Sequence, residues 1–234
     1  MIQTSVAFVI AMAEEAEGVF GLASWEPLGP TPFPTFRRVA GERQAVIVIS
    51  GIGTTNAAAA TQYACERYAP DRVVNLGVVG CLNHDIPIGA VHAVNVCAFF
   101  DVDVTPLGFK IGQIPETEVH EYHLVAGSPT PLPGARLLSG NAFVTGRDGF
   151  HPELAGFAAD FVDMELAAVA HTLLRNGILD RLESYKAPSD YCDSGSAEAF
   201  EQNMPRALAG LGEVADLILR EYGLSNDEAN QARG

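Results

Sequence analysis

The stretch that decides the fold is AVIVISGIGTTNAAAATQYACERYAPDRVVNLGVV, residues 45–79. It begins with a short, β-branched and continuously apolar run at 45–50, which is typical of a strand covered on both faces. After a Gly-rich turn, the Ala-rich segment 54–68 contains neither Gly nor Pro before Pro70, so we expect a helix there. The apolar run 73–79 returns to the strand pattern. This order of elements indicates an α/β fold.

The alternation of strands and helices extends outward on both sides. Apolar runs predict further strands at residues 6–12 and 90–100. Segments 163–176 and 197–222 have the periodicity of helices. A sheet with helices between its strands is therefore expected along the whole chain.

Nothing in the sequence divides the chain into separate folding units. The Pro-rich stretches 27–34 and 127–134 lie between strand-like runs and are interpreted as surface loops rather than linkers. We expect a single α/β domain over residues 1–224, built on a central mixed sheet. The polar end, 225–234, is predicted to be a frayed tail.

Composition limits the class of protein. Of 234 residues, 48% are hydrophobic, which is enough for a sizeable core. The net charge is −15, so binding to nucleic acid or to anionic lipid is disfavoured. Four cysteines without a CxxC pair indicate reduced thiols in a cytoplasmic protein. We expect no targeting signal and no membrane span, because no apolar run approaches about 18 residues.

A group of carboxylates follows the first predicted strand. Glu14, Glu15 and Glu17 open the next helix, where the helix dipole alone favours acidic residues. The carboxyl end of a strand is also where ligands of α/β proteins bind, so one of them could act as a general base. Both readings stay open on these residues alone.

The Gly-rich turn SGIGTTN, residues 50–56, joins a predicted strand to a predicted helix. Such turns let a ligand approach the backbone, and the helix N-terminus favours anions. Asn56 stands where a dinucleotide fingerprint has its third Gly, and the Lys of a phosphate-binding loop is missing. The turn is a weak signal by itself.

Other polar segments allow more than one interpretation. Asp101 and Asp103 would share one face of a strand, which exposure at an edge explains as well as catalysis does. His120 and His123 have the spacing of one helical turn, but no third ligand is evident and we assign no metal. Lys186 begins the segment KAPSDYCD, whose Ser and Asp could equally be a turn or a helix cap.

The segment DMEL at 163–166 points toward function more strongly. A carboxylate that enters a buried, Ala-rich helix needs hydrogen-bond partners or a shifted pKa.

Taken together and in order, six segments resemble the 5′-methylthioadenosine/S-adenosylhomocysteine nucleosidase branch of the purine nucleoside phosphorylase superfamily. The resemblance covers the chain from Val6 to about Tyr222. The segments are AMAEE (11–15), SGIG (50–53), DVDVTPLGFKIGQIP (101–115), GNAFVTG (140–146), FVDMELAAVAH (161–171) and SDYCD (189–193). The resemblance implies a nucleoside phosphorylase-like domain with a mixed, partly barrel-like sheet flanked by helices, no cofactor, and a homodimer. It also implies cleavage of the bond between adenine and a 5′-thio-substituted ribose.

That reaction passes through an oxocarbenium-like ribose, so adenine must be protonated at N7 as it leaves. The resemblance implies that Asp190, with Ser189 beside it, supplies this proton. It implies that Glu15 activates the incoming water, and that Glu165, with Met164 alongside, holds the ribose hydroxyls. Two carboxylates with opposite proton roles suit such a site if their environments separate their pKa values.

The same resemblance assigns the remaining binding positions. Phe143 and Val144 match the adenine slot, where an aromatic face can stack on the base. Four apolar positions match the surroundings of the 5′-thio group: Ile52, Val104, Leu107 and Phe200. Core packing explains Ile52 and Val104 equally well, and Leu107 replaces an aromatic residue common among relatives.

Departures from the family pattern bear on the reaction and the substrate. Superfamily phosphorylases hold phosphate with an Arg-x-Gly-Ser segment, whereas this chain has Asn75 and Val78 at those ends, so water is the expected nucleophile. The resemblance also implies that Val78 and Lys186 are substrate-binding positions. Lys186 stands where many relatives have Arg, and keeps the charge without the bidentate fork. The strand that the resemblance implies before it, at 180–185, is more polar than the usual strand of the family. Cys81 replaces a Gly. A changed substrate, such as a futalosine-type purine nucleoside, is therefore an alternative.

Three further hypotheses about the function remain. A phosphorylase is opposed by Asn75 and Val78, and a non-catalytic nucleoside-binding protein by the presence of both Glu15 and Asp190. A nicotinamide-dependent oxidoreductase rests on the incomplete glycine motif alone. The preference among methylthioadenosine, S-adenosylhomocysteine and 5′-deoxyadenosine is left open.

Overall fold

A computed structural model describes residues 2–125, 131–146 and 150–225. Within them a ten-stranded mixed sheet has the order β10-β6-β8-β9-β5-β1-β4-β3-β2, with β7 paired to β6. The strands are β1 (Gln3–Ile10), β2 (Glu26–Leu28), β3 (Thr35–Ala40), β4 (Arg43–Ile49), β5 (Arg72–Cys81), β6 (His92–Phe99), β7 (Tyr122–His123), β8 (Gly134–Ser139), β9 (Phe161–Asp163) and β10 (Leu182–Asp190).

Part of this sheet closes on itself. β10 pairs with both β6 and β5, so β5, β9, β8, β6 and β10 form a ring of strands. The strands β1, β4, β3 and β2 extend from β5 as an open sheet. The expected single α/β domain with a mixed, partly barrel-like sheet flanked by helices is confirmed.

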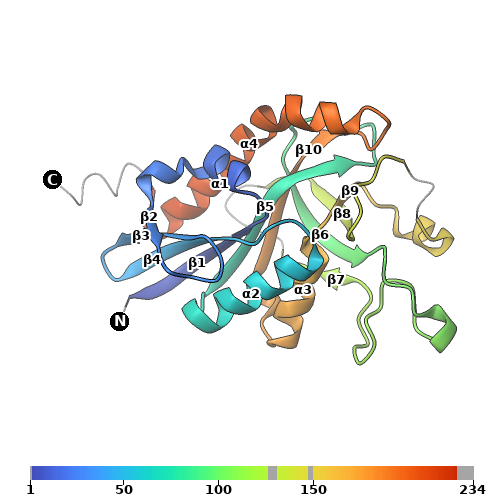
Figure 1. The fold of residues 1–234 in the computed structure, drawn as a ribbon, viewed down its shortest axis with the longest axis horizontal. Coiled ribbons are helices and arrows are strands. Elements are labelled where there is room, and N and C mark those ends of the chain that lie inside the picture. The colour runs from blue at the N-terminus through green and yellow to red at the C-terminus, as the bar shows by residue number, and fades with distance from the viewer. Residues whose placement is uncertain (1, 126–130, 147–149, 226–234) are drawn as a thin grey trace.

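In the described parts of the chain, four α-helices cover the sheet: α1 (Ala13–Phe20), α2 (Thr54–Tyr68), α3 (Leu166–Arg175) and α4 (Ser196–Glu221). α1 and α4 lie on one face, and α2 and α3 on the other (Figure 1). The buried face of α2 consists of small residues, Ala57, Ala60 and Ala64, which allow it to lie close to the sheet. Short 3₁₀ helices occupy Leu22–Ser24, Thr105–Leu107, Pro152–Phe157 and Leu179–Arg181.

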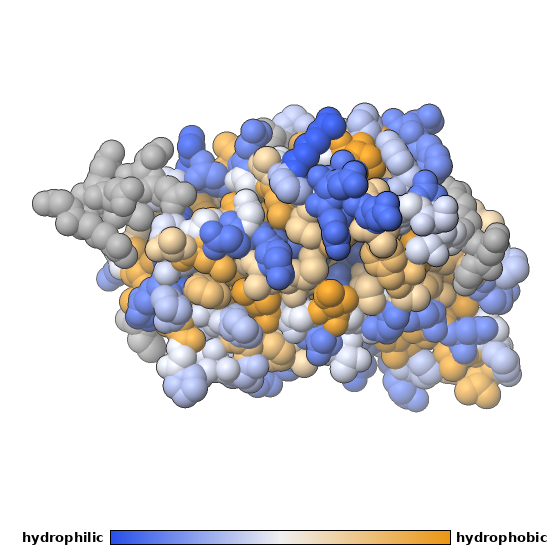
Figure 2. All heavy atoms as spheres, turned by 45° about the horizontal axis from the view of Figure 1, so that its top comes forward, coloured by the Kyte–Doolittle hydropathy of each residue, from blue (hydrophilic) through white to orange (hydrophobic). Residues whose placement is uncertain are grey.

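The apolar faces of the helices account for the two main cores. Leu208, Leu211 and Ile218 of α4 pack with Phe8 and Ile10 of β1 on one side of the sheet. On the surface shown in Figure 2, hydrophilic residues cover much of the outer side of α4. A helix with one apolar and one polar face packs in this way against a sheet. None of the helices in the described parts is long and apolar enough to cross a membrane.

The helix predicted at 54–68 is observed with the same bounds. The strands expected near the N-terminus and in the middle of the chain are observed with ends shifted by a few residues. The helix predicted at 163–176 is shorter, because Phe161–Asp163 forms a strand and α3 begins at Leu166. Asp163 ends that strand and accepts hydrogen bonds from the N–H groups of Glu165 and Leu166.

Two predictions of secondary structure near proline residues were wrong. Pro27 and Leu28 belong to β2, an edge strand paired with β3, where the missing N–H of proline is tolerated. The strand predicted at 180–185 continues through Pro188 to Asp190, with an irregular register between Pro188 and Asp190. The suggested turn or cap at Ser189 and Asp190 is therefore wrong.

Two polar segments also differ from expectation. β6 ends at Phe99, so Asp101 and Asp103 do not lie on a strand. Tyr122 and His123 form β7, so His123 does not share a helical turn with His120. Residues 127–130 of the second Pro-rich stretch and 226–234 of the predicted tail lie outside the described residues.

Candidate active site

A pocket of about 210 Å³ opens where β1, β4, β5, β9 and β10 end. Its walls come from segments far apart in the sequence: Ala11, Met12, Glu15, Ile52, Val78, Val79, Gly80, Ala142, Phe143, Val144, Val162, Asp163, Met164, Glu165, Ser189, Asp190 and Phe200. The structure thus brings together every predicted site residue except Lys186, Val104 and Leu107. The ends of strands in an α/β sheet are the usual place for a ligand.

Glu15 lies in the first turn of α1 with its side chain buried. Its carboxylate accepts hydrogen bonds from the N–H groups of Val78, at 2.9 Å, and Met12, at 3.1 Å. The second bond reaches back to the residue that begins the helix, as in a capping box. Burial raises the pKa of Glu15 above its usual value, although the two N–H groups and Lys186 oppose this. A carboxylate with a raised pKa is a stronger proton acceptor.

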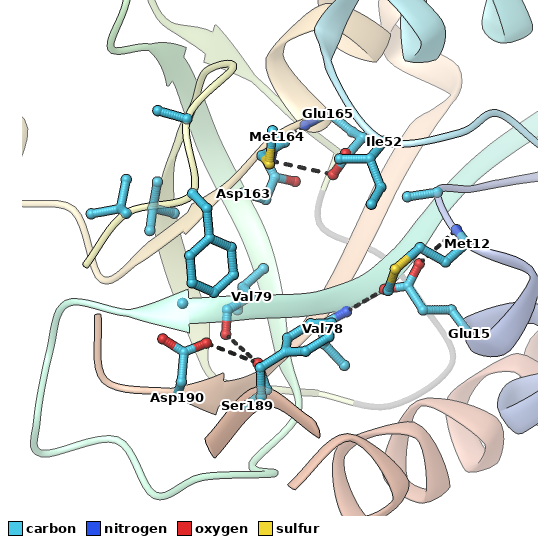
Figure 3. A pocket seen from close by; sticks show the side chains of 17 residues that line it. Met12, Glu15, Ile52, Val78, Val79, Asp163, Met164, Glu165, Ser189 and Asp190 are labelled. Atoms are coloured by element: carbon cyan, nitrogen blue, oxygen red, sulfur yellow. Dashed lines mark hydrogen bonds between the residues drawn. The ribbon is translucent and has the colours of Figure 1, made fainter. Parts of the chain in front are cut away.

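Glu165 stands between β9 and α3, on another wall of the pocket (Figure 3). Its Oε1 accepts a hydrogen bond from the N–H of Gly53 at 2.9 Å, and its Oε2 one from Met164 at 3.2 Å. Gly53 has a φ of 104°, which favours glycine. Burial, followed by the charge of Asp163, raises the pKa of Glu165 to about 7. The Gly-rich turn therefore helps to orient this carboxylate.

Ser189 and Asp190 form the end of β10. Asp190 is 3% exposed, and its Oδ1 accepts a hydrogen bond from the N–H of Cys192 at 2.9 Å. The Ser189 hydroxyl lies 3.1 Å from Asp190 Oδ2 and 3.3 Å from the carbonyl oxygen of Val79. Asp190 and Glu15 lie on opposite sides of Val78 and Val79 (Figure 3). The pocket therefore has a carboxyl group on two of its sides.

The apolar part of the pocket is the more open part. Phe143 and Ile52 are about half exposed, at 51% and 52%. The Phe143 ring meets the Phe200 ring edge to face, with 6.3 Å between their centroids. Val144 and Met12 complete this apolar wall. Exposed aromatic and aliphatic groups at a pocket mouth can bury an apolar ligand group.

Lys186 lies behind the pocket rather than in its wall. Its side chain is 2% exposed, and its Nζ lies 2.9 Å from Asp163 Oδ2. Burial lowers the pKa of Lys186, but the carboxylates of Asp163, Glu165 and Glu15 outweigh this and raise it. Sequence reasoning placed Lys186 with the substrate, and did not assign a role to Asp163. The motif of Asp163 next to Met164 and Glu165 was the signal that could have identified it.

Val104 and Leu107 belong to the loop after β6 and do not line the pocket. Leu107 lies on a 3₁₀ helix and is 74% exposed. Among the residues that the structure describes, no group of three or more His, Cys, Asp or Glu side chains could hold a metal ion.

The sequence model of the Phosphorylase superfamily matches residues 5–220. The chain belongs to this superfamily. A 5′-methylthioadenosine/S-adenosylhomocysteine nucleosidase of Actinobacillus succinogenes is 28% identical over 220 residues, covering 86% of this chain and 92% of its own length. The nucleosidase of the same name from Staphylococcus saprophyticus is 23% identical over 76% of this chain and 82% of its own.

Solved structures show the same fold. That of 5′-methylthioadenosine/S-adenosylhomocysteine nucleosidase from Neisseria meningitidis with methylthio-immucillin-A has a TM-score of 0.80 at 25% identity, covering 92% of this chain and 98% of its own. Futalosine hydrolase from Helicobacter pylori has a TM-score of 0.84 at 20% identity, covering 94% and 99%. The second likeness is one of fold alone.

Proposed function

We propose that this superfamily member is an N-glycosidic hydrolase that releases adenine from 5′-methylthioadenosine and S-adenosylhomocysteine. The observation that carries the proposal is the placement of Glu15 and Asp190 on opposite sides of one pocket, with Glu165 on a third wall. Hydrolysis of an N-glycosidic bond needs an acid at the base and a proton acceptor for water. The nucleosidases similar to this chain support the choice of substrate.

In this proposal Glu165 binds the ribose. Its carboxylate accepts hydrogen bonds from the sugar hydroxyls, with Met164 packed alongside. The N–H groups of Gly53 and Met164 already hold the two carboxylate oxygens in place. A carboxylate fixed before substrate binds loses little entropy when the hydroxyls arrive.

Asp190 donates a proton to N7 of adenine while the bond between C1′ and N9 breaks. The electron pair of that bond passes to the base, which leaves as neutral adenine. Ser189 is within 3.1 Å of Asp190 and orients its carboxyl group. Phe143 and Val144 would hold the adenine ring between apolar surfaces, Phe143 by stacking.

Glu15 accepts a proton from the water that attacks C1′ on the other face of the ribose. The products are adenine and 5-methylthioribose. Asp190 then regains a proton, and Glu15 loses one to solvent. The raised pKa of Glu15 brings its proton affinity nearer to that needed for a general base at neutral pH.

Water is preferred to phosphate as the nucleophile. Among the described residues that line the pocket, none is Lys, Arg or His. Lys186 is paired with Asp163, and the Asn75 amide donates to the carbonyl of Val9, away from the pocket. A phosphate dianion would therefore meet carboxylates and no cation, which disfavours phosphorolysis.

The 5′-thio group would contact Met12, Ile52 and Phe200, an apolar set that suits a methylthio substituent. A futalosine-type nucleoside is the second candidate, because futalosine hydrolase shares the fold. The non-catalytic reading is disfavoured by the buried acid and base.

We also retain the proposals of a homodimer and a cytoplasmic location. In a homodimer the exposed Leu107 of one subunit would be free to approach the pocket of the other, together with Val104. That arrangement would reconcile their predicted place at the 5′-thio group with their distance from the pocket of their own chain.

The test is an incubation with methylthioadenosine, with and without phosphate, analysed for adenine, methylthioribose and its 1-phosphate. We expect adenine and free sugar in both tubes at the same rate. Sugar phosphate formed only with phosphate would identify a phosphorylase. If neither tube contains adenine while a futalosine-type nucleoside is cleaved, the second candidate is correct.

A further inference from the structure

Three buried polar side chains lie directly behind Glu165. Ser139 ends β8, Asp163 ends β9, and Lys186 belongs to β10, and each is less than 9% exposed. The Ser139 hydroxyl donates a hydrogen bond to Asp163 Oδ1 at 2.6 Å, and Lys186 Nζ lies 2.9 Å from Asp163 Oδ2. β9 and β10 are the two neighbours of β5 in the ring, so Lys186 reaches Asp163 past β5. The absence of a side chain at Gly77 leaves space for the Glu15 carboxylate, since an added Cβ would lie 2.9 Å from Glu15 Oε1, and the same Cβ would be in ordinary contact with Lys186 Nζ at 3.5 Å.

Two of these side chains, Ser139 and Asp163, cap the N-terminus of α3, which in most helices is done by the side chain of the N-cap residue. The first N–H groups of a helix have no partner within it, and the N-cap side chain usually accepts from them. In α3 the N-cap residue is Glu165, and its side chain does not cap the helix. Asp163 instead accepts from the N–H groups of Glu165 and Leu166, at 3.1 and 3.2 Å. The Ser139 hydroxyl accepts from the N–H of Ala167 at 2.9 Å.

The consequence is that the Glu165 carboxylate is left free to face the pocket. Lys186 keeps this arrangement in place through its charge. A buried carboxylate without a cation tends to take up a proton, and a protonated Asp163 would be a poorer acceptor for two N–H groups. A Glu165 side chain competing for those N–H groups would turn away from the pocket.

We propose that Ser139, Asp163 and Lys186 form a positioning unit that caps α3 in place of Glu165, and so holds the Glu165 carboxylate against the ribose hydroxyls. The assignment rests on the proposed function. None of the three needs to touch substrate, and Lys186 acts entirely through Asp163.

A pair of substrates separates positioning from stability. Methylthioadenosine and 5′-methylthio-2′-deoxyadenosine differ by the one hydroxyl that Glu165 would hold. The ratio of their kcat/KM values measures that contact, whereas a loss of folded protein lowers both values equally. Hydrogen bonds to charged groups change such ratios by about tenfold or more. The intrinsic reactivities of the two compounds cancel when a variant is compared with the wild type, and we expect Glu165→Gln to reduce the ratio by about that factor relative to wild type.

The variants Asp163→Asn and Lys186→Met should reduce the ratio toward that of Glu165→Gln, and Lys186→Arg should restore most of it. Ser139→Ala removes two hydrogen bonds, the one donated to Asp163 and the one accepted from the N–H of Ala167, but leaves Asp163 paired with Lys186. It therefore tests the proposal even if the charge variants fold poorly. Adding Asp163→Asn to Glu165→Gln should cause no further loss in the ratio, because both act on one contact. The matched control is Arg72→Met, which breaks another buried ion pair away from the pocket and should leave the ratio unchanged.

An unchanged ratio in Ser139→Ala, Asp163→Asn and Lys186→Met, with both substrates slowed equally, would overturn the positioning role while leaving the proposed function intact. A wild-type protein that cleaves neither compound would instead overturn the proposed function, and the assignment with it.

Discussion

Each end of the β5–β10 strand pair has a buried cation paired with carboxylates, but the surroundings of the two groups differ. At the amino end, Arg72 of β5 forms ion pairs with Glu183 of β10 and, at 2.8 Å, with Glu221 of α4. At the carboxyl end, Lys186 faces the carboxylates of Asp163, Glu165 and Glu15. The amino end joins a helix to the sheet through ion pairs, whereas the carboxyl end opens into a pocket lined by Glu15, Asp163 and Glu165.

This difference shows at which end of the strand pair the chain tolerates an unfavourable arrangement of buried carboxylates. Buried charges are costly unless they are paired, and the amino-end network pairs them. At the carboxyl end burial, with a smaller contribution from neighbouring carboxylates, raises the pKa values of Glu15 and Glu165. Groups with shifted pKa values gather at functional sites for this reason. Changes at the carboxyl end should therefore affect turnover, and changes at the amino end stability.

The largest expected effect is that of Asp190→Asn. Losing the general acid should slow adenine release from methylthioadenosine by about 10²–10⁴-fold. The amide keeps the size of the side chain, so adenine should bind nearly as well, as measured by equilibrium dialysis, and the urea midpoint should change little. A variant with the wild-type rate would remove Asp190 from the mechanism.

Glu15→Gln should slow hydrolysis by a comparable or somewhat smaller factor, because Glu15 would no longer accept the proton of water. The burial that raises the pKa of Glu15 also makes its ionised form costly, so the amide should unfold at an equal or higher urea concentration. Kinetics and urea unfolding on one preparation check both expectations. Full activity would mean that another group accepts the proton.

Arg72→Met tests the opposite end of the strand pair. It leaves Glu183 buried without its cation, which typically costs about 3–5 kcal/mol of unfolding free energy. Urea unfolding should show this loss, while KM and kcat of the remaining folded protein stay at wild-type values. A changed KM would show that the two ends are coupled, which the comparison does not predict.

The pH dependence follows from Glu165, whose pKa is about 7 in the folded protein and near 4.5 when unfolded. The folded state binds the proton more tightly, so this group contributes stability that is fully present below pH 4.5 and is lost as the pH rises through about 7. Ribose binding needs the ionised form, so 1/KM should rise over the same interval. Glu165→Gln should flatten both curves. A stability curve with the same slope in this variant would contradict the assignment.

The smallest effect is expected for Phe143→Leu. Its ring stacks on adenine in our proposal, and such contacts are worth about 0.5–1.5 kcal/mol beyond area burial. We expect KM to rise severalfold with little change in kcat. Phe157→Leu, a buried aromatic outside the pocket, is the matched control and should lower stability instead.

Much of the fold could be predicted from local patterns. Continuous apolar runs identified β1, β4, β5 and β6, and the uninterrupted Ala-rich segment identified α2. β10 was only partly recognised, because Pro188 lacks an N–H and is rare within central strands. The irregular register next to it accommodates the proline, and this depends on β5. An accommodation that depends on a neighbouring strand cannot be predicted from a local sequence pattern.

The candidate site, like the fold, could be predicted only in part from the sequence. The family motifs named Glu15, Glu165 and Asp190, and the structure places all three in one pocket. The position of Lys186 could not be predicted, because strand periodicity gives the face of a residue but not the partner across a closed ring. Asp163 was noticed as a polar residue entering a buried helix, but its bond to Lys186 joins positions 23 residues apart in the chain.

The closure of the strand ring has a consequence for synthesis. Glu15 leaves the ribosome well before β10, which supplies Asp190 and pairs with β5 and β6. A nascent chain therefore cannot complete the ring, or bring Glu15 and Asp190 together, until β10 has been translated. Until then the edges of β5 and β6 that β10 will cover lack their partner strand, and unpaired edges favour association between chains. Folding of β10 onto the sheet thus completes the pocket and covers these two strand edges in one step.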